Sequence, residues 1–286
     1  MIARNLIHLV RSHADLAPEL RRNLAQLAAA NPGWRQIILS DEEALEFVRK
    51  HYTPRHLEAL ARIDPVYGPA RSDLLRYLVL YQIGGVYLDN KSGLKRPLDQ
   101  ILRPDDDYLV VQWDNGPGGA EEHFGFHPEI AEVDGGEYIN WVLCSRAGHP
   151  YLAAVIDRVV ENIETYSVAK FGVGKLGTLR TTGPIAYTQA IHPILGLHPH
   201  RRVLSVPEGF LYTALSEPSS HLFLHKLHYS RLRHPVVLPD PRVTPLGTRM
   251  AAHLSRRVLI GLAWLRHRNR HRRKQSRLRR GVVRGR

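Results

Sequence analysis

Charged side chains lie close together in one short stretch of this 286-residue chain. Asp73 and Arg76 are three residues apart, so on a helix they share one face. Asp89 and Lys91 follow a short apolar run, which is typical of a buried strand. Charged groups at the end of such a strand lie at the edge of an α/β sheet, where ligands bind. These four residues therefore predict a polar site that a helix and a strand build together.

A helix, two glycines and a strand must position these side chains. The helix is indicated by an apolar face at helical spacing, which consists of Leu74, Tyr77, Leu78 and Tyr81. Gly84 and Gly85 end this helix, because glycine tolerates the left-handed conformation of a helix cap. Within the strand, Tyr87 alternates with Asp89 and so points to the same side. A core tyrosine is the alternative for Tyr87.

Strands and helices alternate over the first 240 residues. We expect strands at residues 4–10, 34–39, 86–88 and 108–113. We expect helices at residues 15–30, 40–48, 54–63 and 150–166, and either a strand or a helix at 139–145. An order of this kind favours an α/β fold, in which helices pack on a sheet.

Charge is distributed unevenly along the chain, whose formal net charge is +13. Residues 241–286 contain fifteen Arg or Lys and no acidic residue, whereas the first 240 residues contain 25 basic and 27 acidic residues. The basic character therefore belongs to the C-terminus. We expect one domain over residues 1–240 and a basic helical tail over residues 241–286.

Cysteine usage and hydropathy exclude several classes of protein. Cys144 is the only cysteine, so neither an intrachain disulfide nor a cysteine-rich metal site can form. The apolar run at the N-terminus is too short for a secretory signal. No apolar stretch reaches the length of about 18 residues that a membrane-spanning helix needs, so we expect no such helix.

The stretch around Asp89 resembles the sugar-binding region of family 32 glycosyltransferases. This family includes yeast initiating mannosyltransferases and many bacterial polysaccharide enzymes. Its pattern is Ala-Arg-x-Asp, then an Arg-Tyr helix, then Gly-Gly-x-Tyr-x-Asp-x-Asp. Nine positions of this chain agree with the pattern in type and spacing, namely Ala70, Arg71, Asp73, Arg76, Tyr77, Gly84, Gly85, Tyr87 and Asp89. Weaker similarity flanks this stretch at residues 5–8, 138–152 and 181–184.

The resemblance implies a GT-A fold, which is a Rossmann-like mixed sheet flanked by helices. It also implies a glycosyltransferase that moves a sugar from a nucleotide-sugar donor, a UDP- or GDP-sugar, to a saccharide or lipid-linked acceptor. The implied reaction proceeds with retention and serves polysaccharide or glycolipid biosynthesis. The alternative is a non-catalytic relative that binds a nucleotide-sugar through a degenerate Asp-x-Asp motif.

The resemblance and the position of each residue give expected roles. The expected catalytic residues are Asp89, Lys91 and Arg76. The expected donor-binding residues are His8, Asp73, Arg76, Gly85, Tyr87, Asp89 and Asn140. The expected acceptor-side residues are Asp114, Thr182 and Gly183. Structural alternatives are a core histidine at position 8, a surface ion pair between positions 73 and 76, and an ordinary turn at position 114.

The metal-binding half of the motif is changed in this chain. In the family, the two carboxylates of Asp-x-Asp hold a divalent metal that stabilises the negative charge on the departing diphosphate. Here the sequence reads Asp89-Asn90-Lys91, and an ammonium group cannot ligate a cation. Two alternatives follow. Asp89 holds Mg²⁺ or Mn²⁺ through waters as the single protein ligand, or Lys91 itself supplies positive charge beside the diphosphate.

The basic tail gives the expected location. Residues 246–268 carry an apolar stripe flanked by arginines, a pattern that can lie in a membrane interface. A polybasic segment behind such a helix adds about 1 kcal/mol per basic residue close to anionic lipid. We therefore expect a cytoplasmic protein, peripheral at the inner face of the membrane, with no nucleic acid as partner. A merely solvated tail is the alternative.

Deletion of residues 246–286 tests the expected location. We expect the full chain to float with liposomes that contain anionic lipid and the shortened chain to stay in the soluble fraction, because the deletion removes the basic and apolar groups together. Flotation in a density gradient measures this difference, with liposomes of neutral lipid as the control. Equal flotation of the two chains would contradict the membrane assignment.

Overall fold

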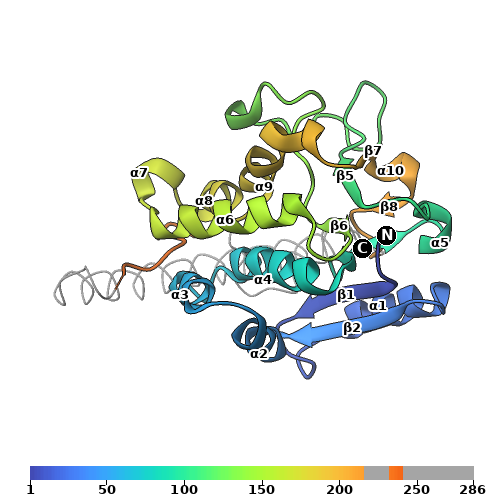
Figure 1. Ribbon diagram of the computed structural model, residues 1–286, viewed down its shortest axis with the longest axis horizontal. Coiled ribbons are helices and arrows are strands. Elements are labelled where there is room, and N and C mark those ends of the chain that lie inside the picture. The colour runs from blue at the N-terminus through green and yellow to red at the C-terminus, as the bar shows by residue number, and fades with distance from the viewer. Residues whose placement is uncertain (216–231, 241–286) are drawn as a thin grey trace, which may run out of the picture.

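The computed structural model describes residues 1–215 and 232–240. Its main strands are β1 (Asn5–Val10), β2 (Arg35–Ser40), β3 (Gly85–Leu88), β5 (Tyr108–Gln112), β6 (Val142–Ser145) and β7 (Arg201–Leu204). Within the described residues these six strands form one mixed sheet with the order β2-β1-β3-β6-β5-β7 (Figure 1). A short ladder joins β4 (Gly93–Leu94) to β8 (Phe210–Leu211).

Strand direction decides which loops share an edge of the sheet. Strand β6 runs antiparallel to its neighbours β3 and β5, and the other pairs of neighbours are parallel. The carboxyl ends of β1, β3 and β5 therefore lie at the same edge, and the residues just before β6 reach this edge as well. Asp89 follows β3 there, and Asn140 lies just before β6.

Helices cover both faces of the sheet. The helices that enter the argument are α1 (Pro18–Ala30), α2 (Asp41–His51), α3 (Pro54–Arg62), α4 (Gly68–Ile83), α5 (Leu98–Ile101), α6 (Pro150–Glu164), α8 (Gly174–Thr181) and α9 (Pro184–Ile191). Short helices α7 (Val168–Phe171) and α10 (Ser205–Glu208) lie in the connections. The mixed sheet with helices on both faces confirms the expected α/β fold class. For residues 139–145, where a strand or a helix was expected, the structure has the strand β6 at residues 142–145.

Two apolar cores lie on the two faces of the sheet. One core contains Ile7 and Tyr87 together with side chains of α2, α3, α4, α6 and α9. The other contains Leu6 and Val86 together with side chains of α1 and α5. Successive strand residues point to opposite faces, so His8 falls on the second face with Leu6.

Helix α4 is buried on all sides, whereas its sequence indicated a single apolar face. Residues 73–80 are buried without interruption. Figure 1 shows the reason, because α4 lies in the middle of the molecule with α2 and α6 on either side of it. Asp73 and Arg76 are therefore interior residues, and interior charges must find partners within the protein.

The glycine pair ends α4 and starts β3 as expected. Gly84 caps the helix with φ of 62°, and its N–H donates to the carbonyl of Leu80. Gly85 has φ of 124°, and a Cβ at this position would lie 2.4 Å from the backbone oxygen of Asn5. Gly85 therefore lets the start of β3 approach β1 closely.

The C-terminal part of the described chain packs back onto the domain. Val237 forms an antiparallel bridge with Ile63, and Pro235 forms one with Val173. Val236 is fully buried between them. Residues 235–240 therefore wrap against the domain. The expected domain boundary at residue 240 stays a prediction, and the basic tail lies outside the described residues.

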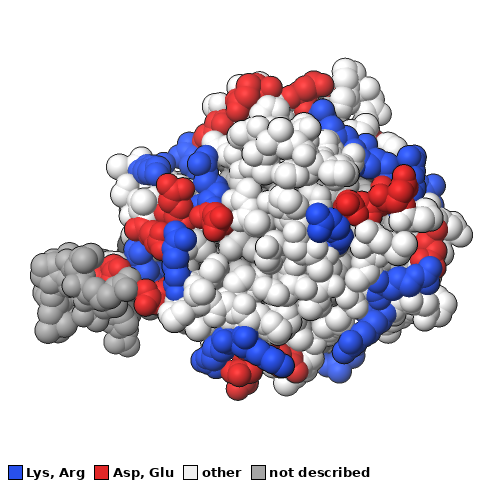
Figure 2. Space-filling view, viewed as in Figure 1, with Lys and Arg blue, Asp and Glu red and all other residues white. Residues whose placement is uncertain are grey.

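Charged side chains of both signs lie at the surface of the described part of the chain. Lys and Arg lie beside Asp and Glu around the rim of the face seen in Figure 2, in keeping with the nearly balanced charge of residues 1–240. Over residues 1–215 and 232–240, no helix combines the length and the apolar character that a membrane span requires.

Replacement of Gly85 by alanine tests the close approach of β3 to β1. We expect Gly85→Ala to lower the free energy of unfolding by roughly 2–5 kcal/mol, because the new Cβ adds backbone strain to a clash with Asn5. Urea denaturation followed by circular dichroism measures the change. Gly68→Ala at the other end of α4 is the matched control, since nothing lies within 4 Å of its Cβ position. Equal stability of the two variants would contradict this assignment.

Candidate active site

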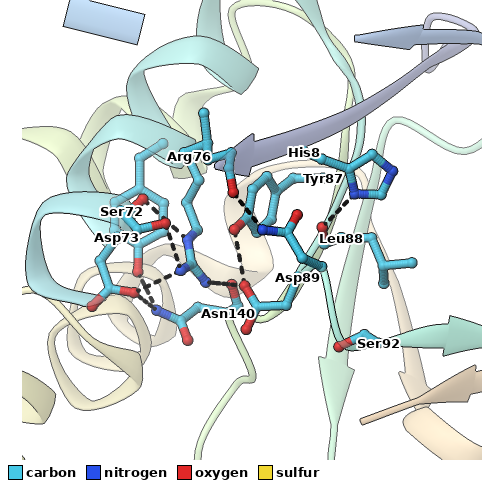
Figure 3. A network of polar contacts seen from close by, with 12 residues as sticks. His8, Ser72, Asp73, Arg76, Tyr87, Leu88, Asp89, Ser92 and Asn140 are labelled. Atoms are coloured by element: carbon cyan, nitrogen blue, oxygen red, sulfur yellow. Dashed lines mark hydrogen bonds and ion pairs between the residues drawn. The ribbon is translucent and has the colours of Figure 1, made fainter. Parts of the chain in front are cut away.

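Helix α4 and the end of β3 bring three charged side chains together. Asp73 and Arg76 lie one helical turn apart, and their side chains are only 8% and 6% exposed. Asp89 directly follows β3, and its side chain is 25% exposed. The guanidinium of Arg76 lies between the two carboxylates (Figure 3). The alternative of a surface ion pair is therefore wrong, because the pair is buried.

The guanidinium of Arg76 is engaged by protein oxygens. Its Nη1 lies 3.3 Å from Oδ1 of Asp89 and donates to the carbonyl of Asn140 at 2.6 Å. Its Nη2 lies 3.4 Å from Oδ1 of Asp73 and donates to Oγ of Ser72. Its Nε donates to the backbone carbonyl of Ser72. Three hydrogen bonds to the protein and two ion pairs with carboxylates therefore surround the guanidinium. Arg76 holds its neighbours in place, and its charge is directed at Asp73 and Asp89.

The carboxylate of Asp73 is engaged by protein groups as well. Oδ1 accepts from the side-chain amide of Asn140 at 3.1 Å, and Oδ2 accepts from the hydroxyl of Thr182 at 2.9 Å. Burial raises the pKa of Asp73 to about 6, although Arg76 and Thr182 oppose the shift. Both oxygens of Asp73 therefore contact protein groups, and the carboxylate also pairs with Arg76. A contact of Asp73 with sugar hydroxyls stays a prediction.

Asp89 is the member of this group that can reach a ligand. Its Oδ1 accepts from the hydroxyl of Tyr87 at 2.9 Å and faces Arg76. Its backbone N–H donates to the carbonyl of Trp141. No residue in the described part of the chain donates to Oδ2. One oxygen of Asp89 is thus fixed by the protein, and the other is open to a donor from outside.

Tyr87 is a core residue, and its hydroxyl also points to the same side of β3 as Asp89. Its ring is buried and lies under the guanidinium of Arg76, 4.6 Å from the ring centroid to the Cζ atom. Its hydroxyl reaches Asp89, as the alternation along β3 predicted. Tyr87 is therefore a core residue that also orients the carboxylate.

Lys91 does not take part in the ion pairs that join Asp73, Arg76 and Asp89. Its Nζ lies 3.7 Å above the ring centroid of Tyr212, which follows β8. Tyr212 contacts Trp113 and Trp141, with centroid distances of 5.2 and 5.5 Å. Asp73, Arg76 and Asp89 therefore lie together as expected. Lys91 lies over a neighbouring aromatic side chain, and its part in the site stays a prediction.

His8 is a core histidine with one unsatisfied nitrogen. Its Nδ1 lies 2.9 Å from the carbonyl of Leu88, so Nδ1 carries the proton. Burial lowers the pKa of His8 to about 4, which keeps the ring neutral. Its Nε2 is buried without a partner among the described residues. The expected donor-binding role of His8 stays a prediction.

Several expected site residues are placed elsewhere or serve the scaffold. Gly85 lies at the opposite end of β3 from Asp89, against Asn5. Thr182 is fully buried beneath Asp73, and Gly183 starts α9 where a Cβ would meet Leu179 at 2.9 Å. The donor-side role of Gly85 and the acceptor-side roles of Thr182 and Gly183 stay predictions.

Asn140 and Asp114 also have roles within the protein. The amide of Asn140 donates to Asp73 and to the hydroxyl of Tyr77 at 2.7 Å, so it supports the site from within. The carboxylate of Asp114 accepts from the N–H of Ala120 at 3.1 Å, six residues later, so it closes the loop that follows β5. An acceptor contact of Asp114 stays a prediction.

The donor set at this site does not fit a divalent cation held by the protein. Over the described ranges, no three side chains of His, Cys, Asp or Glu gather in a way that could hold a metal. Of the two carboxylates in this cluster, Asp89 alone has an oxygen that is open to a ligand, since the Arg76 guanidinium lies between Asp89 and Asp73. Lys91 occupies the second position of the motif with a cation. We derive no step through a metal.

Tyr212, Trp113 and Trp141 were not identified from the sequence. Trp113 directly follows β5 and Trp141 directly precedes β6, so their places at the carboxyl edge offered a signal once the strands were assigned. Tyr212 offered none, because it reaches the site through the pairing of β4 with β8, which has no local pattern.

Residues 18–108 match the family model described as the glycosyltransferase sugar-binding region containing the DXD motif. The matched range includes Asp73, Arg76 and Asp89. It confirms the resemblance inferred from the spacing of residues 70–91.

Two fungal proteins are similar over parts of their length. A mannosyl phosphorylinositol ceramide synthase of Saccharomyces cerevisiae is 30% identical over 97 residues, which are 34% of this chain and 25% of that protein. An inositol phosphoceramide mannosyltransferase of Schizosaccharomyces pombe is 34% identical over 156 residues, which are 54% of this chain and 35% of that protein. The chain therefore spans about a quarter to a third of the length of these relatives.

A solved structure shows the same fold. The PaToxG glycosyltransferase superposes with a TM-score of 0.51 over 68% of this chain and 71% of that chain, at 17% identity. The similarity supports the GT-A type of fold that the sequence implied.

Removal of the Arg76 charge tests the buried cluster. At pH 7 we expect Arg76→Met to lower the free energy of unfolding by about 3–5 kcal/mol, because it leaves two carboxylates without their cation. The loss should be smaller at pH 5. Without Arg76 the pKa of Asp73 rises further above 6, so its carboxyl is then neutral and its burial no longer costs a charge.

Urea denaturation at the two pH values measures this pattern. Arg55→Met is the matched control, because Arg55 pairs with Glu164 at the surface and its side chain is 52% exposed. This variant should lose no more than about 1 kcal/mol. Similar small losses in both variants, independent of pH, would show that the Arg76 cluster does not support the fold.

Proposed function

We propose that this chain, which matches the sugar-binding region of DXD-type glycosyltransferases over residues 18–108, transfers a hexose from a nucleotide-sugar to a hydroxyl acceptor. One observation carries the proposal. At the carboxyl edge of the sheet, Asp89 is fixed by Tyr87 and Arg76 through one oxygen and presents the other to a ligand. Crevices at this edge are the usual ligand sites of α/β folds.

The open oxygen of Asp89 suits a sugar hydroxyl as its partner. A hydroxyl donates to a carboxylate in a short, charge-assisted hydrogen bond. Because Asp89 is held rigidly, it orients the donor sugar without losing side-chain freedom on binding. Its negative charge also stabilises the positive charge that develops on the sugar ring in an oxocarbenium-like transition state.

The transfer itself is a nucleophilic substitution at the anomeric carbon, C1. The bond between C1 and the diphosphate oxygen breaks, and its electron pair stays on the diphosphate. The acceptor oxygen forms the new bond to C1, and its proton passes to the departing diphosphate. The products are the glycoside and the nucleoside diphosphate.

Retention with attack on the front face fits the carboxylates of this site. By analogy with retaining glycosidases, a covalent intermediate requires a carboxylate that attacks C1 from the face opposite the departing diphosphate. Asp73 is buried and engaged by Asn140 and Thr182, so it cannot serve as this nucleophile. Proton transfer to the departing diphosphate on the same face needs no such group.

The relatives suggest the substrate class. Their names describe mannosyltransferases that act on inositol phosphoceramide or synthesise a mannosylated form of it. We therefore infer a UDP- or GDP-hexose as donor and a saccharide or lipid-linked acceptor. A lipid-linked acceptor agrees with the proposed placement of the basic tail at the inner membrane surface.

A non-catalytic nucleotide-sugar-binding protein is the second candidate. Lys91 favours it, because a lysine replaces the second carboxylate of the motif. The two candidates differ in turnover: a transferase releases UDP or GDP from its donor, and a binding protein does not.

The variant Asp89→Asn tests the proposal. It removes the charge, keeps the size of the side chain and leaves an oxygen for the Tyr87 hydroxyl. We expect release of UDP or GDP from the preferred nucleotide-hexose to fall by about 10²–10³-fold, because the transition-state charge loses its partner. A coupled assay over a panel of UDP- and GDP-hexoses, with saccharide and lipid-linked acceptors, measures the rate.

Asp105→Asn is the matched control, since Asp105 is exposed. It should keep the full rate, and thermal unfolding should show that both variants are folded. Full activity of Asp89→Asn would contradict the assigned role of this carboxylate. A wild-type chain that binds a nucleotide-sugar but never turns it over would favour the non-catalytic candidate.

A further inference from the structure

We propose that the ammonium group of Lys91 binds the diphosphate of the donor in the place of a divalent cation, so that donor binding needs no metal. This inference rests on the proposed function and adds to it the group that faces the diphosphate. Its basis is the geometry of Lys91, its lack of an anionic partner within residues 1–215 and 232–240, and the charge distribution around Asp89.

The backbone of Lys91 is fixed close to Asp89. The turn closes where the N–H of Ser92 donates to the carbonyl of Asp89 at 2.9 Å. On one side, the amide of Asn23 on α1 donates to the carbonyls of Asn90 and Ser92, both at 2.8 Å. On the other side, the carbonyl of Lys91 accepts from the N–H of Ala214 at 2.8 Å. The side chain therefore starts from a rigid position two residues beyond Asp89.

The ammonium group is held in a way that leaves its hydrogen-bond donors free. Its Nζ lies over the ring of Tyr212, and a cation–π contact attracts the charge without using an N–H group. Lys91 is half-buried, and in residues 1–215 and 232–240 it makes no ion pair. An ammonium group has three N–H donors, so Lys91 can give them to an anion.

The surroundings of Lys91 strengthen an electrostatic contact with an anion. Tyr212, Trp113 and Trp141 pack against one another, with centroid distances of 5.2 to 5.8 Å. Aromatic side chains exclude water, so a charge pair beside them is screened less than at an open surface. The buried Nε1–H of Trp141 also has no acceptor in the described structure. This side of the site has unused donors, which complements a ligand rich in oxygen atoms.

The charges near Asp89 show why an anion needs Lys91. Asp73, Arg76 and Asp89 together carry two negative charges and one positive charge, and the guanidinium of Arg76 is buried and pairs with both carboxylates. They suit a sugar and repel a diphosphate. Lys91 offers an unpaired positive charge at the motif's second position. A divalent cation there would be repelled by the same ammonium group, so the two ways of binding a diphosphate exclude each other.

Nucleotide binding by the full chain in excess EDTA tests the proposal. Titration calorimetry with UDP and with GDP gives the dissociation constants, with and without added Mn²⁺. We expect one of the two nucleotides to bind in EDTA and Mn²⁺ to change its dissociation constant by less than about twofold. Lys91→Met should weaken binding about tenfold or more, because a charge-assisted contact is lost. Lys95→Met, at an exposed lysine four residues away, should bind like the wild type.

A second variant should make nucleotide binding depend on a divalent metal. Lys91→Asp recreates the Asp-x-Asp motif, so we expect it to bind no nucleotide in EDTA and to recover binding when Mn²⁺ is added. Since Lys91 is half-buried, this variant should remain folded, which thermal unfolding checks. Nucleotide binding by the wild-type chain in EDTA tests metal independence even if a variant is unstable.

The outcomes separate this inference from the proposed function. Wild-type binding that is lost in EDTA and restored by Mn²⁺ would overturn the role of Lys91 and leave sugar transfer intact. Unchanged binding by Lys91→Met would overturn it as well. Failure of UDP and GDP to bind under any of these conditions, together with no turnover of nucleotide-hexoses, would overturn the proposed function and with it this inference.

Discussion

The guanidinium of Arg76 is the group on which the candidate site depends. A carboxylate alone in the interior would cost several kcal/mol, and so would an unpaired guanidinium, which is why the three charges are acceptable only together. The consequence for function is rigidity. Because Arg76 and Tyr87 hold one oxygen of Asp89, the direction of the other oxygen is set before any ligand arrives. Removal of any one member would change the direction or the charge of the others.

Local periodicity explains what could be predicted from the sequence. The spacing of Asp73, Arg76 and Asp89 lies within one helix and the strand after it, so helical and strand geometry alone place the three side chains together. The direction of Lys91 follows from the pairing of β4 with β8, and the support by Thr182 comes from 109 residues away. No local pattern carries such information, and the burial of α4 on all sides likewise depends on helices that the sequence of α4 does not describe.

In the proposed complex, charges of opposite sign face the two halves of the donor. The carboxylate of Asp89 follows β3 directly, and the ammonium of Lys91 comes two residues later, over the ring of Tyr212. A nucleotide-sugar has the complementary distribution, since its sugar gains positive charge and its diphosphate gains negative charge as the bond between them breaks. One short turn of the backbone can therefore orient the donor along the direction in which charge separates.

The polar contacts of Asp73 have a consequence for how the chain folds. Its two carboxylate oxygens accept from residues that lie 67 and 109 positions later in the sequence. During synthesis from the N-terminus, α4 is complete long before Asn140 and Thr182 have left the ribosome. Until they arrive, Asp73 keeps its water, and the helix cannot settle into the interior. Closure of the central helix against the sheet should therefore be a late event in folding, and the sugar site comes into being only with it.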